Sequence, residues 1–163
     1  MSDAYERLIA LLDENHASYR TIDHPPEGRT ELVSPMRGNA VRDAAKCIIV
    51  MLKLGKKVTK YVLAVVPGDA RVDLNALKQL FGGTYASFAS ADIAESMAGS
   101  VMGTVLPFAF DERLELIADP QVLEPAEIFF NAARLDRSLA ISSADYARIA
   151  KPRLERIAVR QES

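Results

Sequence analysis

The chain has 163 residues, of which 49% are hydrophobic and 26% charged, and its formal net charge is −2. This length is enough for one domain with a substantial hydrophobic core. The small net charge argues against a protein that coats nucleic acid through many phosphate contacts, while a local basic site stays compatible with it. A single cysteine and two histidines exclude a disulfide framework, a cysteine-rich metal site and a histidine cluster. We therefore expect no bound metal and no cofactor.

The chain also lacks the patterns of a membrane or secreted protein. No apolar run approaches the roughly 20 residues of a membrane span, and the acidic N-terminal segment does not resemble a signal peptide. We expect a cytoplasmic enzyme or binding domain that does not engage a membrane.

Apolar periodicity and breaker residues divide the first half of the chain into short elements. The expected elements are a helix ending near residues 15–16, strands at 18–22, 44–52 and 60–66, and a turn at 54–57. Residues 44–52 form the most apolar run, which predicts a strand buried on both faces. The polar stretch 27–38 contains the breakers Gly28, Pro35 and Gly38, so we expect a loop there.

The second half alternates irregularly between helices and strands. The expected elements are a helix capped by Asp73, strands at 85–89, 114–118, 126–131 and 138–141, a short helix after Ser90, and a last helix capped by Ser142. Strands and helices do not alternate strictly, so a single mixed α+β domain is favoured over a doubly wound sheet. We place its core at residues 6–152 and expect 153–163 to be a charged, poorly held tail.

A glycine- and proline-containing stretch at residues 99–108 is the first candidate for a ligand site. Gly99 and Gly103 are four residues apart, and Pro107 follows after four more. Glycine lets a ligand approach the backbone closely, and proline fixes the local shape. A rigid loop with accessible backbone groups suits a small polar ligand; the alternative is a simple turn between strands.

Lys46 is the second candidate, because it opens the buried strand. Strand alternation places it on the same side as Ile48 and Val50, which is an apolar face. A lysine there must extend to water, meet an acid from elsewhere or hold an anionic ligand. If Lys46 has a functional role, we expect its charged amine to bind a phosphate or a carboxylate of the ligand.

Other polar residues have two open interpretations. Asn131 caps a turn or projects as a polar group into an apolar pocket, and Thr30 and Arg37 line a site or face water. His24, beside two prolines, is expected to be a solvated or hydrogen-bonding residue rather than a general base. Cys47 lies within the apolar run, so we expect it in the core and not as a nucleophile.

Several motifs together resemble the YbaK/prolyl-tRNA synthetase associated editing-domain family, and most closely its free-standing YeaK-type branch. They are Ala44-Ala45-Lys46, Val66-Pro67-Gly68-Asp69, Val72-Asp73-Leu74, the stretch from Gly99 to Phe108, and the run from Ile128 to Ser138. The resemblance implies a mixed α+β domain with a curved, barrel-like sheet. It also implies hydrolysis of wrongly charged aminoacyl-tRNA, with tRNA as partner and an aminoacyl-tRNA synthetase as a further expected partner.

The resemblance also implies roles for individual residues. Lys46 would hold the 3′ end of the tRNA, and the Gly-x-x-x-Pro loop from Gly103 to Pro107 would surround the ester, with the ribose hydroxyl of the substrate helping to activate water. Ester hydrolysis by preorganised backbone dipoles needs no catalytic serine or histidine. The expected substrate-binding residues are Thr30, Gly99, Ser100, Thr104 and Asn131.

Small residues near the expected pocket, Ser87, Ser100 and Thr104, indicate a small amino acid such as alanine, serine or threonine. Two alternatives use the same fold. One is a non-catalytic module that binds tRNA or a synthetase. The other is an esterase for small molecules that is indifferent to RNA.

Overall fold

The computed structural model describes residues 3–160. Its helices are α1 (Asp3–Glu14), α2 (Thr30–Arg37), α3 (Leu74–Leu80), α4 (Ala91–Ala98) and α5 (Ser143–Ala150), with 3-10 turns at Val41–Asp43 and Pro120–Leu123. Its strands are β1 (Tyr19–Asp23), β2 (Ala45–Leu54), β3 (Val58–Pro67), β4 (Ala70–Val72), β5 (Tyr85–Phe88), β6 (Leu114–Ala118), β7 (Glu127–Asn131), β8 (Arg137–Ser142), β9 (Arg153–Leu154) and β10 (Ala158–Arg160).

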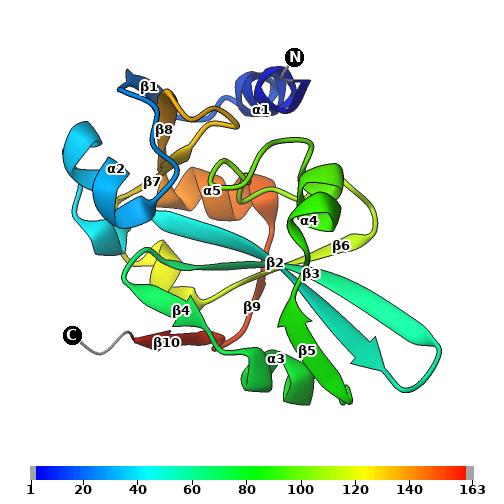
Figure 1. Cartoon of the computed structure of the whole chain (residues 1–163). Coiled ribbons are helices and arrows are strands. Elements are labelled where there is room, and N and C mark those ends of the chain that lie inside the picture. The colour runs from blue at the N-terminus through cyan, green and yellow to red at the C-terminus, as the bar shows by residue number, and fades with distance from the viewer. Residues whose placement is uncertain (1–2, 161–163) are drawn as a thin grey trace.

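The strands form three sheets around a long central hairpin. A five-stranded sheet has the order β5-β2-β3-β6-β9, a three-stranded sheet has the order β1-β8-β7, and β10 pairs with β4. The β2–β3 hairpin crosses the middle of the molecule, with the three-stranded sheet and α1 on one side (Figure 1). A parallel bridge between Ala44 and Phe129 joins the three-stranded sheet to the start of β2.

The two faces of β2 and β3 bury two separate apolar clusters. Ile49 and Leu63 pack into a cluster with α1, α4 and the 99–108 loop, whereas Val50 and Leu52 pack into a smaller cluster with β4 and α3. Because side chains alternate between the two faces of a strand, neighbouring residues of β2 enter different clusters. Both faces of the hairpin are therefore covered, as the continuous apolar run predicts.

Most expected elements are present, and the single mixed α+β domain is confirmed. Asp73, Ser90 and Ser142 cap their helices by accepting hydrogen bonds from backbone N–H groups. The expected barrel-like sheet is replaced by three sheets, and within residues 3–160 they do not close into a barrel. None of the helices in that range is both long and apolar enough to span a membrane.

Two expectations are wrong. Residues 30–37 form α2 rather than a loop; the helix tolerates Pro35 because Val33 and Arg37 are buried against the rest of the protein and Gly38 ends the helix in the left-handed conformation. Residues 153–160 of the expected tail are also held, since β9 pairs with β6, β10 pairs with β4, and Ile157 is only 1% exposed; residues 161–163 lie outside the described residues. Asp119 fixes this segment by accepting from the N–H groups of Ile157 and Ala158.

Candidate functional site

The site lies where the edge of β2 loses its neighbour. Strand β5 pairs with β2 only over Val50–Lys53, and the N–H of Ala89 donates to the carbonyl of Ile49. Peptide groups alternate in direction along a strand, so the N–H and C=O of Cys47 point to the same side as those of Ile49, beyond the end of β5. The first half of β2 thus borders open space.

A polar cavity of about 260 Å³ occupies this position. Its lining comes from α2 and the loop before it, from β2, from the 99–108 loop and from β7: Gly28, Arg29, Thr30, Glu31, Val33, Arg37, Ala45, Lys46, Cys47, Ile48, Met102, Gly103, Val105, Phe130 and Asn131. Three cationic side chains and one carboxylate are among them. Of the residues that the sequence indicated, Lys46, Gly103, Thr30 and Asn131 meet here. Arg29 is paired with Glu27, so Lys46 and Arg37 are the cations that favour an anionic ligand.

An apolar cavity of about 230 Å³ adjoins the polar one. Both are lined by Cys47, Ile48, Met102, Gly103 and Val105, and the apolar cavity adds Ile49, Phe88, Ala89 and Ala94. Together they give a site with a charged compartment and an apolar compartment, the usual composition of a small-molecule pocket.

Lys46 projects on the face expected from the sequence, with its amine donating to the carbonyl of Ala70 in β4 at 2.8 Å. No carboxylate lies within ion-pair distance of it in the described part of the chain. Burial lowers the pKa of the Lys46 amine below its usual range, and the charges of Glu31 and Asp69 act in the opposite direction. A half-buried amine whose only hydrogen-bond partner is a carbonyl keeps capacity for an anion.

The 99–108 loop is held at several points. The Nδ2 of Asn131 donates to the carbonyl of Gly103 at 3.0 Å, the hydroxyl of Tyr146 donates to the carbonyl of Pro107 at 2.8 Å, and Glu95 accepts from the N–H of Met102. Within the described residues, the N–H groups of Gly103 and Val105 have no acceptor. Both residues line the polar cavity. The loop, held in place by these hydrogen bonds, therefore contains two backbone N–H groups that can donate to a ligand.

Asn131 is the buried connection between this loop and the loop before α2. Its Nδ2 donates to the carbonyl of Glu27 at 2.8 Å as well as to that of Gly103. Its Oδ1 accepts from Ser138 Oγ at 2.9 Å and from Arg37 Nη1 at 3.3 Å. All its hydrogen-bonding capacity is used within the protein, so it positions the two loops rather than presenting a free amide.

A buried polar network surrounds Asn131. The Nη1 of Arg37 donates to Ser138 Oγ at 2.8 Å, its Nε donates to Asn39 Oδ1, and His24 Nε2 lies 2.7 Å from Ser138 Oγ. Arg37 is 8% exposed and these hydrogen-bond partners are neutral. Burial lowers the pKa of Arg37 to about 10, so it stays cationic at neutral pH. His24 has the hydrogen-bonding role expected of it and does not line either cavity.

Four expected residues lie away from the two cavities. Thr104 is buried, and its hydroxyl donates to the carbonyl of Val101 at 2.6 Å; the hydroxyl of Ser100 donates to the carbonyl of Thr104. Gly99 ends α4 in the left-handed conformation, and Pro107 is buried. Their groups shape the loop, and they do not line the compartments around Lys46. Ser87 lines neither compartment either.

Within residues 3–160, the site has no residues suited to nucleophilic catalysis or to metal catalysis. Burial raises the pKa of the Cys47 thiol above its usual range, which keeps it protonated at neutral pH. In the region that the structure describes, no three His, Cys, Asp or Glu side chains gather as a metal site. The site therefore presents cations and backbone dipoles to a ligand.

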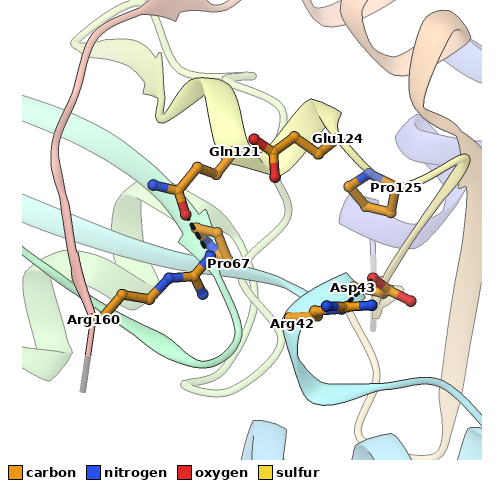
Figure 2. Close-up of a pocket in the computed structure, with 7 residues that line it drawn as sticks. All are labelled: Arg42, Asp43, Pro67, Gln121, Glu124, Pro125 and Arg160. Atoms are coloured by element: carbon orange, nitrogen blue, oxygen red, sulfur yellow. Dashed lines mark hydrogen bonds and ion pairs between the residues drawn. The ribbon is translucent and has the colours of Figure 1, made fainter. Parts of the chain in front are cut away.

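A separate cavity of about 280 Å³ is lined by residues from the end of β3, from the two 3-10 turns and the residues directly after the second, and from β10: Arg42, Asp43, Pro67, Gln121, Glu124, Pro125 and Arg160 (Figure 2). Its two arginines already have partners: Arg160 pairs with Asp69 and donates to Gln121, and Arg42 pairs with Asp43. We therefore do not place the functional site there.

Sequence reasoning overlooked Gly28, Ile48, Met102 and Val105. Ile48 lines both compartments, and Gly28 contacts the backbone of Gly103. Gly28 was recognisable as a breaker, whereas its contact joins residues 75 positions apart and leaves no local signal. Ile48 and Val105 are ordinary strand and loop residues whose exposure depends on where β5 ends.

Known proteins share this arrangement of elements. The model of the aminoacyl-tRNA editing domain matches residues 24–149. The chain is 41% identical over 154 residues to the multifunctional Ser/Thr-tRNA deacylase ProXp-y of Escherichia coli (strain K12), covering 94% of this chain and 92% of that protein. It is 26% identical over 153 residues to the prolyl-tRNA editing protein ProX of Acetoanaerobium sticklandii, covering 91% and 92% of the two chains.

The fold agrees as well. The crystal structure of a candidate trans-editing enzyme for prolyl tRNA synthetase superposes with a TM-score of 0.77 over 99% of both chains, at 17% identity. The family match extends over most of the chain and confirms the resemblance that the sequence motifs indicate. The chain belongs to the aminoacyl-tRNA editing domain family.

Proposed function

We propose that this protein is a free-standing aminoacyl-tRNA deacylase that hydrolyses the ester of tRNA mischarged with a small amino acid, foremost serine or threonine. The observation that carries the proposal is the polar cavity, which Lys46, Gly103 and Val105 all line and where, within residues 3–160, the N–H groups of Gly103 and Val105 have no acceptor. The names of the relatives, one a Ser/Thr-tRNA deacylase and one a prolyl-tRNA editing protein, support the same reaction.

Each group has a defined task in this proposal. The Lys46 amine binds the terminal nucleotide of the tRNA through a phosphate or ribose oxygen and so orients the ester. The N–H groups of Gly103 and Val105 donate to the ester carbonyl oxygen, which gains negative charge as water attacks. Preorganised backbone donors of this kind are worth several kcal/mol in the transition state, about 2.7–4 for one donor.

The remaining groups position the substrate and water. The ribose hydroxyl of the substrate beside the ester helps to activate the attacking water. Thr30 lines the cavity, and its hydroxyl has no hydrogen-bond partner within residues 3–160, so this group is available to the amino acid. Asn131 and Pro107 act indirectly, because each holds the Gly103 loop through a hydrogen bond. No covalent intermediate is required.

The partner and location follow from this reaction. The substrate is charged tRNA, which places the enzyme in the cytoplasm. The net charge of −2 leaves few cations for contacts along the tRNA body. An aminoacyl-tRNA synthetase that holds the tRNA during editing is consistent with this shortage.

The test is a deacylation screen with tRNAs carrying alanine, serine, threonine or cysteine, with and without added synthetase. The wild-type protein is compared with Lys46→Ala and with Lys53→Ala, a control on the exposed end of the same strand. Release of serine or threonine that is lost only in Lys46→Ala supports the proposal. Binding of tRNA without release of any amino acid supports instead a non-catalytic module, and cleavage of small esters independent of RNA supports an esterase.

A further inference from the structure

A third hollow continues from the site along the outer face of the protein. It has a volume of about 530 Å³ and is lined by Lys46, Ile48, Arg71, Val72, Asp73, Leu74, Phe88 and Val159; we call it the outer groove. It shares Lys46 and Ile48 with the polar cavity, and Ile48 and Phe88 with the apolar cavity. A ligand that leaves the polar cavity past Lys46 therefore enters the outer groove.

The surface of the outer groove combines an aromatic ring with free positive charge. Phe88, at the end of β5, is 54% exposed. Arg71 and Val159 are paired across the β4–β10 ladder and both point outward. Arg71 has no ion-pair partner in the described part of the chain, whereas the carboxylate of Asp73 is engaged in capping α3. The groove thus has two cations, Lys46 and Arg71, and one carboxylate, that of Asp73, which is already hydrogen-bonded as the cap of α3.

An exposed aromatic ring beside cations that track a groove is the arrangement that binds single-stranded nucleic acid. Bases stack on the ring, and the cations contact the phosphates. The volume of the groove also lies within the range of about 300–1,000 Å³ typical of small-ligand sites. A duplex offers no free base to stack on this ring, because its bases are already stacked and paired.

We propose that the outer groove binds the unpaired nucleotides that precede the terminal adenosine of the tRNA, with a base stacked on Phe88 and a phosphate held by Arg71. This inference rests on the proposed function, since that function places the terminal ester in the adjoining polar cavity. It explains how the enzyme grips its substrate with few cations: contacts are concentrated at the single-stranded 3′ end.

The test measures binding of fluorescein-labelled uncharged tRNA, complete or lacking its unpaired 3′ nucleotides. Arg71→Ala and Phe88→Ala are each expected to weaken binding of the complete tRNA about tenfold, and Phe88→Tyr to restore it. Arg71→Ala is also expected to lower the slope of log Kd against log salt by about 0.7, the value for one single-stranded phosphate contact. None of these variants is expected to change binding of the truncated tRNA.

Two control variants of matched chemistry are available. Tyr85→Ala removes an equally exposed aromatic ring from β5, and Arg156→Ala removes an exposed arginine; neither residue lines the outer groove. Both controls are expected to bind complete tRNA like the wild type. The proposal is overturned if Arg71→Ala and Phe88→Ala also bind like the wild type, or if wild-type binding does not depend on the 3′ nucleotides. Unchanged RNA affinity with loss of a synthetase complex would overturn it in favour of a protein partner.

Deacylation of seryl-tRNA and threonyl-tRNA, measured with the same samples, separates this inference from the proposed function. If the wild type releases the amino acid and the variants bind RNA with unaltered affinity, the proposed deacylase function stands and RNA binding by the outer groove is rejected. If the variants lose tenfold in RNA affinity but the wild type releases no amino acid, RNA binding by the outer groove stands and the proposed deacylase function is rejected.

Discussion

The backbone of Gly103 lies against that of Gly28, and Gly103 has no room for a side chain. A Cβ on Gly103 would lie 2.8 Å from the Cα of Gly28 and 3.0 Å from its carbonyl oxygen, and Gly103 has a φ of +87°. This contact brings the loop before α2 against the 99–108 loop at the wall of the polar cavity. The shape of the candidate site therefore depends on two glycines far apart in sequence.

Gly103→Ala is expected to lower the free energy of unfolding by at least about 2 kcal/mol, because it adds a backbone clash to an unfavourable φ. Gly55→Ala is the matched control: Gly55 has a φ of +84° and nothing within 4 Å of its added Cβ. Gly55→Ala is expected to lower the free energy of unfolding by about 1–2 kcal/mol, because alanine is strained at this positive φ. Urea unfolding of both variants measures the difference, and equal losses would show that the Gly28 contact is unimportant.

Asn131→Ala is expected to destabilise the protein by about 2–4 kcal/mol, because it leaves the carbonyls of Glu27 and Gly103 without their donor and removes an acceptor from Arg37. Asn75→Ala, on the exposed surface of α3, is expected to change stability by less than about 0.5 kcal/mol. Urea denaturation provides both values. An Asn131→Ala variant as stable as the control would show that the two loops are held by other contacts.

The strands and helix caps were predictable because their signals are local. Asp73 and Ser142 precede apolar helical faces, which is typical of helix caps. The apolar run within residues 44–52 is typical of a strand buried on both faces. The sequence also located Lys46 and Gly103, although only the fold shows that they share a cavity. Asn131 was recognised as polar at the end of a strand, but its bonds to Glu27 and Gly103 depend on tertiary structure.

The errors have the same origin. Pro35 and the polar composition of residues 30–37 argue against a helix, and α2 forms because burial of Val33, the buried hydrogen bonds of Arg37 and the left-handed C-cap at Gly38 outweigh that local preference. The charged C-terminal segment looks unfavourable for strands, yet Asp119 supplies acceptors that fix it from outside. Neither contribution can be read from a sequence window.

Lys46 gives a prediction about pH. Burial lowers its pKa in the folded state relative to the unfolded state, so the unfolded chain binds more protons between the two pKa values, and stability rises with pH there. The burial cost of the charged amine is fully present below the folded-state pKa and is relieved as pH approaches 10.5. Relative to Lys46→Met, the wild type is thus expected to gain stability as pH rises from 8 towards 10.5. A pH-independent difference between them would contradict this environment for the amine.

Cys47 is expected to be dispensable. Its thiol is held protonated by burial, and the proposed reaction needs no protein nucleophile. Cys47→Ala is expected to keep deacylation within about threefold of the wild type, whereas loss of a true nucleophile costs several orders of magnitude. The measurement is the rate of serine release from seryl-tRNA by equal amounts of folded protein. A loss of more than about a hundredfold would assign a catalytic thiol to the site.

The most direct test of the account is the single-turnover rate of serine release from seryl-tRNA by the wild type, Gly103→Ala and Gly55→Ala, under conditions where all three are folded. The account predicts that the wild type and Gly55→Ala accelerate release well above the spontaneous rate, and that Gly103→Ala loses at least about a hundredfold, the effect of displacing backbone donors from the ester. Release by Gly103→Ala at the wild-type rate would contradict catalysis by the Gly103 loop. No acceleration of serine release by the wild type would contradict the deacylation of seryl-tRNA itself.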